Sequence, residues 1–399
     1  MNTLISETGR VLNPRFFKIS ADSPARGGPL GSKAPPTEGV GSGSRATAPP
    51  ECADNVSARL STAEHFHPSG PAEEFTRRGP WRLGVLSNPL SGGNRRHGLG
   101  AIRRCLRHYP EIPHREVRTA TDVQAALEDF AGRDLNLIAV NSGDGTVQAV
   151  LTVLLGQRLF PSLPLLALLS GGTTNMTHQD LGLCGSAADA LRRLLSWAHH
   201  GDGPAVILQR TILKVQTPSG TNPLYGLFFG SACIFNGIQF FHSWVHRMGL
   251  SGDAAHLLIM TRFLWALARR DDALVAPVPA GIHTDRLGVA PRDYLLLLVT
   301  TLDRLILGLR PFWQPGEGPL RLTAVSARPR HLLRVLPFLI RGRRHAYAQP
   351  GNGYISCSAR EIRLDLNGGF AVDGELFSAD ARRGSILIQD GGRADFVKL

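Results

Sequence analysis

Short apolar runs alternate with segments of helical periodicity between residues 82 and 200. Runs such as Leu-Asn-Leu-Ile-Ala-Val-Asn at 135–141 are expected of parallel strands that are covered on both faces. The pattern predicts strands at 82–87, 116–119, 135–141 and 165–169, and helices at 99–108, 122–131, 146–155 and 186–198. This β-α repetition indicates an α/β fold with a doubly wound parallel sheet.

After residue 203 the pattern changes to that of strands. Extended segments are expected at 206–217, 225–234, 295–301, 320–325, 362–366 and 386–389, with one helix at 253–269. These predict a second domain that is mainly antiparallel. We therefore divide the chain into a disordered leader (1–79), an α/β domain (80–203), a strand-rich domain (204–380) and a C-terminal segment (381–399). Whether that last segment returns to the first domain stays open.

Composition narrows the class of protein. Of the 399 residues, 43% are hydrophobic and 19% are charged, which is a normal globular balance. The net charge of +12 indicates an anionic partner, whether nucleotide, nucleic acid or acidic lipid. The five cysteines are scattered without a CxxC, which argues against a disulfide framework or a zinc site. No signal peptide and no run of about 20 apolar residues is visible, so we expect a cytoplasmic protein, at most peripheral to a membrane.

A first Gly-rich loop, Asn88-Pro-Leu-Ser-Gly-Gly93, follows the first expected strand. Glycines let backbone N–H groups approach a phosphate closely, and a following helix favours anions at its N-terminus. The alternative is an ordinary solvent-exposed turn. The loop lacks the spacing of a P-loop.

A second loop, Ser142-Gly-Asp-Gly-Thr-Val-Gln148, follows the third expected strand. Asp144 lies between two glycines, where its carboxylate would orient Mg²⁺ or accept a proton from an attacking hydroxyl. The alternative makes Asp144 a helix N-cap, although two glycines are more than a cap requires.

A third loop, Ser170-Gly-Gly-Thr-Thr-Asn175, follows the fourth expected strand. Its hydroxyls and amide can donate to phosphate or ribose oxygens, but such clusters are also common turns. Because ligands of open α/β sheets bind at the carboxyl ends of the strands, the three loops together predict one binding site.

These three loops and the triplet Asp373-Gly374-Glu375 resemble the diacylglycerol kinase catalytic-domain family, which includes sphingosine and ceramide kinases. The resemblance runs from about residue 82 to the C-terminus. It implies a nucleotide-binding α/β domain like that of NAD kinases, a β-sandwich that contacts the lipid, and ATP with Mg²⁺ between them. The implied reaction is transfer of the ATP γ-phosphate to a hydroxyl of a lipid such as diacylglycerol or a sphingoid base.

The resemblance also implies roles for individual residues. Glu375 matches the family's general base, and Asp144 is expected to assist it or to bind Mg²⁺. The Asp-Gly pair before Glu375 is equally typical of a hairpin turn. The residues that match the family's nucleotide-binding positions are Asn88, Ser91, Gly92, Thr119, Ser142, Gly143, Asp144, Gly145, Thr146, Val147, Gln148, Thr173 and Asn175.

Three positions depart from the family pattern. Ser142 replaces a glycine, which is mild if its φ is negative. Met176 stands where many members have Asp. Near Glu317, where several bacterial members hold a structural Mg²⁺, Arg321 occupies the place of an Asp. We therefore expect no structural metal site there, while Mg²⁺ accompanying ATP remains expected.

Residues 318–360 contain eight arginines and no Asp or Glu. The segment 330–345 mixes them with apolar residues, which favours either contact with an anionic membrane or an ordinary packed segment with a solvated basic face. The segment 256–270 has an apolar side best explained by core packing.

Three other functions remain as rivals. They are an NAD kinase-like enzyme, a non-catalytic lipid- or nucleotide-binding relative, and a nucleic-acid-binding protein. We expect no nucleic-acid partner, because no aromatic stacking platform interleaves the arginines. The acceptor lipid and the oligomeric state, a homodimer included, stay open.

Overall fold

The computed structural model describes residues 80–399, except positions 202, 219, 221, 249–275, 286, 287 and 315 and the side chains of 241–248. The expected leader (1–79) and the expected helix at 253–269, with the segment 256–270, lie outside the described residues. Within them, no helix is long and apolar enough to cross a membrane.

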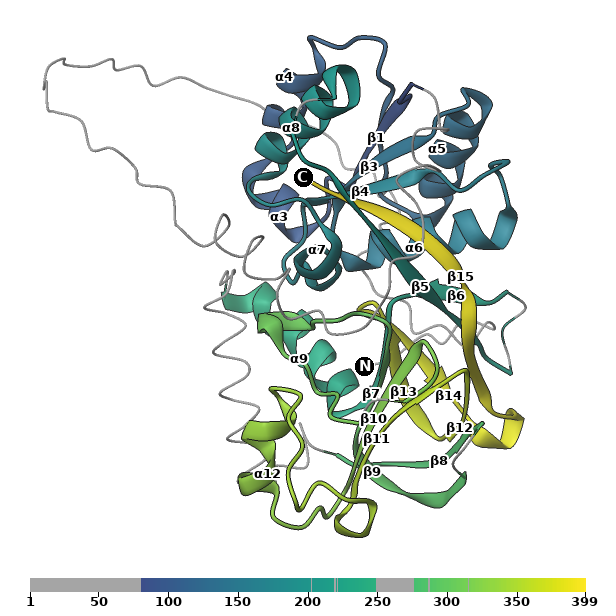
Figure 1. The fold of residues 1–399 in the computed structure, drawn as a ribbon. Coiled ribbons are helices and arrows are strands. Elements are labelled where there is room, and N and C mark those ends of the chain that lie inside the picture. The colour runs from purple at the N-terminus through teal and green to yellow at the C-terminus, as the bar shows by residue number, and fades with distance from the viewer. Residues whose placement is uncertain are drawn as a thin grey trace, which may run out of the picture. The chain divides into compact units, whose positions relative to one another are not determined.

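The first part of the described chain is a parallel sheet flanked by helices (Figure 1). Its strands β4, β3, β1 and β2 are neighbours in that order, and all pair in parallel. The helices α5 and α6 pack on one side through Val123, Leu127, Phe130 and Leu151, which are buried in one core with strand residues. The elements are β1 (Leu83–Ser87), α3 (Gly92–His97), α4 (Gly100–Leu106), β2 (His114–Glu116), α5 (Ala120–Gly132), β3 (Leu137–Ser142), α6 (Asp144–Gln157), β4 (Leu165–Ser170), α7 (Met176–Leu181) and α8 (Ala187–His200).

The second part is rich in antiparallel strands, which share a second buried core. Its elements are β5 (Val206–Gln216), β6 (Leu224–Gly226), β7 (Phe228–Ala232), α9 (Cys233–Met248), β8 (Val278–Thr284), β9 (Gly288–Thr300), η1 (Ile306–Gly308), β10 (Leu320–Ser326), α12 (Leu332–Leu339), η2 (Pro350–Asn352), β11 (Tyr354–Ala359), β12 (Glu361–Leu366), β13 (Gly368–Val372), β14 (Glu375–Ala379), η3 (Ala381–Arg383) and β15 (Ile386–Lys398). The α/β fold with a strand-rich C-terminal region is confirmed.

The long strand β15 joins the two parts. It pairs with β12 at its start and with β5 along most of its length, and Phe396 pairs in parallel with Leu166 of β4. Figure 1 shows this yellow strand running from β12 to the edge of the parallel sheet. The hydrogen-bonded sheet is therefore continuous from β14 to β2.

Four expected strands are wrong in their bounds. Those at 295–301 and 386–389 lie at the end of β9 and at the start of β15, which are both longer. The one expected at 116–119 is also wrong, because β2 ends at Glu116 and Thr119 begins α5 with a capping box. The Thr119 hydroxyl accepts from the Asp122 N–H (3.1 Å), and the Asp122 carboxylate accepts from the Thr119 N–H (2.9 Å).

The fourth of these strands was expected at 225–234. It is broken at Leu227 between β6 and β7, and α9 begins at Cys233. The residue just before the helix, Ala232, has a positive φ of 58°. This left-handed residue turns the chain from strand to helix, and residue type alone does not signal it.

Candidate functional site

The three Gly-rich loops follow β1, β3 and β4, which are adjacent in the sheet, and they contact one another. The Ser91 hydroxyl of the first loop accepts from the Gly143 N–H of the second (3.1 Å). The Asn94 N–H of α3 donates to the Gly171 carbonyl of the third loop (3.1 Å). One polar surface is therefore built from three strand ends, as the sequence indicated.

Glycine is required where these loops cross. A Cβ on Gly93 would lie 2.9 Å from the carbonyl oxygens of both Gly171 and Gly172. A Cβ on Gly172 would lie 2.6 Å from the Gly143 Cα. A Cβ on Gly92 would overlap the Thr173 hydroxyl, which would have to rotate away. The loops thus approach one another at backbone distance, which side chains larger than hydrogen would prevent.

Asn88 is buried and ties the first loop to α6. Its Nδ2 donates to the Thr146 hydroxyl (2.8 Å), and its Oδ1 accepts from the Leu90 N–H (2.8 Å). The sequence did not point to Asn94, whose Nδ2 donates to the carbonyls of Asn88 (2.8 Å) and Asn141 (3.0 Å). In the sequence, the only sign of a role for Asn94 is that a polar residue follows two glycines directly, and such a pattern is a weak signal.

Asn175 shapes the third loop. It has a left-handed φ of 49°, its Oδ1 accepts from the Gly172 N–H (2.8 Å), and its Nδ2 donates to the Ser170 hydroxyl (3.0 Å). Asn tolerates this conformation better than most residues do. Both ends of the Asn175 side-chain amide therefore make hydrogen bonds within the third loop itself.

Ser142 is the last residue of β3, and its φ is not positive, so replacement of a glycine there costs no backbone strain. Two other residues of the second loop point elsewhere. Val147 is buried in the hydrophobic core, and Gln148 donates to the Thr152 hydroxyl (3.0 Å) within α6. Thr119 caps α5, as described above. Nucleotide contacts by these residues stay predictions.

Asp144 is not the N-cap of its own helix, because Gly143 holds that position. Its carboxylate instead accepts from the backbone N–H groups of Met176 (3.0 Å) and Thr177 (2.8 Å), the first residues of α7. Burial raises the pKa of Asp144 more than these hydrogen bonds lower it. Asp144 thus holds the start of α7 beside the loops.

Asp373 and Gly374 form the two-residue turn between β13 and β14, with positive φ values of 46° and 90°. Two positive values are those of a type I′ hairpin turn, so the turn interpretation is confirmed. Asp373 is nevertheless buried, and its Oδ2 accepts from the Leu227 N–H (2.9 Å). Burial, reinforced by the charge of Asp144, raises the pKa of Asp373 well above its usual range.

Glu375 opens β14 and lies against the N-terminus of α6. A Cβ on Gly145 would be 3.2 Å from the Glu375 Cδ and closer still to Oε1. The hairpin thus brings a carboxylate from the strand-rich part onto the second loop. The candidate site therefore joins four segments that are far apart in sequence: the three loops and Asp373–Glu375.

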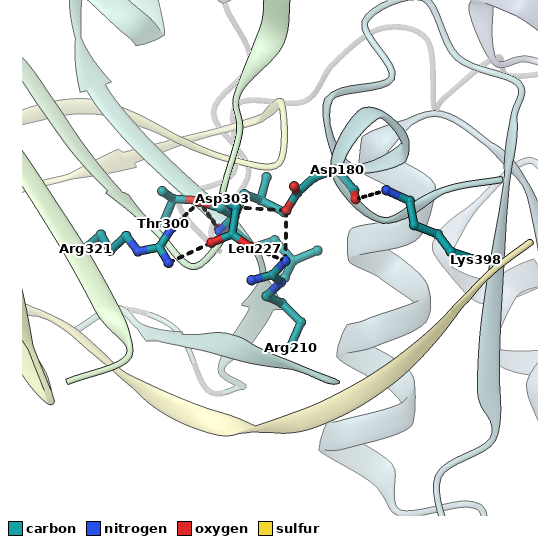
Figure 2. Close-up of polar contacts among 8 residues, drawn as sticks. Asp180, Arg210, Leu227, Thr300, Asp303, Arg321 and Lys398 are labelled. Carbon is teal, nitrogen blue, oxygen red and sulfur yellow. Dashed lines mark hydrogen bonds and ion pairs between the residues drawn. The ribbon is translucent and has the colours of Figure 1, made fainter. Parts of the chain in front are cut away.

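A polar network fixes the far end of α7 (Figure 2). The buried carboxylate of Asp180 accepts from Arg210 (3.2 Å) and from the Asp303 N–H (3.0 Å), and its carbonyl accepts from Lys398 (2.7 Å). Burial raises the pKa of Asp180 more than Arg210 lowers it. The sequence did not predict this network, because its members come from distant elements.

Arg321 belongs to the same network. Its guanidinium donates to the Asp303 carboxylate (2.7 Å) and to the Leu302 carbonyl (3.0 Å). Burial raises the pKa of Asp303, but Arg210 and Arg321 together outweigh it, so the pKa is lowered. A protein cation thus occupies the place where the resemblance pointed to a metal-binding Asp.

Comparisons with known proteins support the fold described above. Residues 82–202 match the model of the diacylglycerol kinase catalytic domain. Two solved structures assigned as diacylglycerol kinases, both from Bacillus anthracis str. Sterne, superpose with TM-scores of 0.51 at 18% and 16% identity. Each comparison covers 79% of this chain and 96% of the other. At that identity the likeness shows the fold. No curated protein matches the chain.

The loops that carry the sequence motifs, Asn88–Gly93, Ser142–Gln148 and Ser170–Asn175, all lie within the matched segment. Residues 82–202 therefore belong to the diacylglycerol kinase catalytic-domain family.

Proposed function

We propose that this chain is an ATP-dependent lipid kinase that transfers the γ-phosphate of ATP to a lipid hydroxyl. The observation that carries the proposal is the placement of Glu375 against Gly145, at the N-terminus of α6 and beside the joined loops. Phosphates are bound by backbone N–H groups at such helix starts, and the acceptor hydroxyl would then lie next to the carboxylate.

Glu375 is the general base in this proposal. It accepts the proton of the acceptor hydroxyl as the new P–O bond forms. Asp144 is less suited to that role, because its carboxylate oxygens are engaged by the N–H groups of Met176 and Thr177. We assign Asp144 the task of holding α7 and the third loop in place.

Mg²⁺ fits this site as a companion of ATP. Among the described residues, no group of three or more His, Cys, Asp or Glu side chains could hold a metal ion. Mg²⁺ is commonly held by substrate phosphates with one or two carboxylates. Asp373, whose Oδ1 is buried without a hydrogen-bond partner, would be one of them and would release its proton on binding. Bound there, Mg²⁺ would neutralise charge on the transferred phosphate.

A panel of lipid alcohols with labelled ATP tests the proposal. We expect phosphorylated lipid with the parent, and a loss of about 10²–10⁴-fold in kcat with Glu375→Gln, which keeps the shape but removes the base. Asp144→Asn should cost less than Glu375→Gln if Asp144 positions α7. ATP binding without turnover of any lipid would refute the proposal and favour a non-catalytic relative. Phosphorylation of NAD instead would favour the NAD kinase-like alternative.

A further inference from the structure

The helix α12 has one packed side and one exposed apolar side. Val335 and Leu339 are buried in a small core with Trp313 and Tyr354. Leu333, on the other side, is 74% exposed. An ordinary packed helix with a solvated polar face explains Val335 and Leu339, but it does not explain Leu333.

A row of rings runs along α12 from its N-cap residue, His331, to Phe338 in its last turn. His331 stacks on Tyr347 (4.2 Å between ring centroids), Tyr347 neighbours His345 (5.4 Å), and His345 neighbours Phe338 (4.6 Å). Phe338 and Tyr347 are exposed. Aromatic and imidazole rings therefore lie among the arginines of this segment. The rings are not adjacent in sequence, and the turn after α12 brings them together.

The surface around the rings is positively charged. Arg330, Arg334, Arg341, Arg343 and Arg344 are exposed, and the whole segment 318–360 has no Asp or Glu. Among the described residues, no ion pair involves Arg334, Arg343 or Arg344. We call this set, Leu333, Phe338, Tyr347 and these five arginines, the α12 surface.

We propose that the α12 surface docks the protein on an anionic lipid bilayer. The inference rests on the proposed function, since a lipid kinase must reach an acceptor that resides in a membrane. Arginines lie at the level of anionic headgroups, Tyr and Phe rings fit the interface, and Leu333 enters the acyl boundary. The charge of the surface is complementary to acidic headgroups.

Single-stranded nucleic acid is a less suitable occupant. It requires open ring faces on which bases stack. Here His331 and Tyr347 stack on each other, with 25° between the ring planes. The aliphatic Leu333 has no counterpart in nucleic acid.

Vesicle binding tests the proposal without reference to catalysis. Dissociation constants are measured by flotation of the full chain with vesicles of phosphatidylcholine alone and with added phosphatidylserine. We expect binding only to the anionic vesicles. Arg343→Gln with Arg344→Gln should weaken it by about 30-fold, from about 1 kcal/mol for each basic residue. The control Arg104→Gln with Arg107→Gln removes the same charge from exposed positions at the C-terminal end of α4 and should change vesicle binding little.

An apolar pair of variants completes the test. Leu333→Ser should weaken vesicle binding by about tenfold, whereas Val206→Ser, at another exposed apolar residue, should not. Equal binding by the parent and both α12 variants would overturn the proposal. The proposal would also be overturned if the parent bound a single-stranded oligonucleotide but no vesicles, and the α12 variants lost only the oligonucleotide binding.

Failure of this proposal can be told from failure of the proposed function. A short-chain lipid alcohol below its micelle concentration needs no bilayer. Turnover of this substrate by a chain that binds no vesicles would overturn the docking proposal and keep the proposed kinase function. If instead the parent binds vesicles, the α12 variants lose that binding, and no lipid is phosphorylated, the docking proposal stands and the kinase function is refuted.

Discussion

Gly145→Ala isolates the contribution of Glu375 to the proposed reaction. The new Cβ would lie 3.2 Å from the Glu375 Cδ and closer to Oε1, whereas ordinary contact requires about 3.5–4 Å. The Gly145 φ is not positive, so the backbone accepts alanine. The carboxylate must therefore move by about 1 Å, a displacement that can cost about 10²-fold in rate.

Stability should respond differently from rate. The end of a glutamate side chain yields at small cost, and alanine is favoured over glycine in a helix by about 0.5–1 kcal/mol. We expect the melting temperature of Gly145→Ala to stay near that of the parent while kcat falls about 10²-fold. Gly132→Ala on α5 is the matched control, because apart from its chain neighbours and the backbone of its own helix no atom lies within 4 Å of a Cβ at this position. It should raise stability and leave kcat unchanged.

The assay is turnover of the lipid alcohol with labelled ATP, beside a titration of ATP binding. If Gly145→Ala acts through Glu375, the double variant with Glu375→Gln should be no slower than Glu375→Gln alone. A folded Gly145→Ala enzyme with kcat within threefold of the parent would refute the reasoning. If Gly145→Ala weakened ATP binding by as much as it lowered kcat, the substitution would act on the nucleotide rather than on Glu375.

Three further predictions concern stability and are checked by chemical denaturation. Because the pKa of Asp373 is raised, the folded chain keeps a proton that the unfolded chain releases. The contribution of this proton to the free energy of unfolding is therefore lost as pH rises from about 4 through that pKa. Asp373→Asn should therefore gain stability relative to the parent as pH rises; a constant difference would contradict this. Thr119→Ala should cost about 1 kcal/mol by removing the cap of α5, and no loss would mean that the capping box is not formed. Asp180→Asn should lower the free energy of unfolding by about 1–3 kcal/mol, because it leaves Arg210 with one carboxylate fewer. This prediction is wrong if Arg210→Gln, which removes the other partner, leaves the free energy of unfolding unchanged.

The sequence predicted β1, β3, β4 and the helices α4, α5, α6 and α8 because their periodicity is local. The six-residue helices α3 and α7 were not predicted, because they are too short to show a period. An apolar run such as 135–141 reports burial on both faces whatever its neighbours are. The glycines of the three loops were informative for the same reason, since glycine and Asp together mark close approach to a ligand. Boundaries follow from weaker signals: the apolar pattern puts Thr119 on a strand, although Thr119-x-x-Asp122 is a local capping signal.

Only the tertiary structure decided how these pieces cooperate. Asp144 caps a helix 32 residues away, and Glu375 reaches Gly145 because the β13–β14 hairpin packs beside α6. Hydrogen bonds of that kind depend on relative position in space, which residue type and spacing do not encode. The same holds for the α12 surface, where a turn brings His345 and Tyr347 against α12. Thus the sequence by itself determined the candidate residues and most elements of the α/β part. The strands β8, β11, β13 and β14, and the assignment of the candidate residues to base, positioning group or docking surface, required the fold.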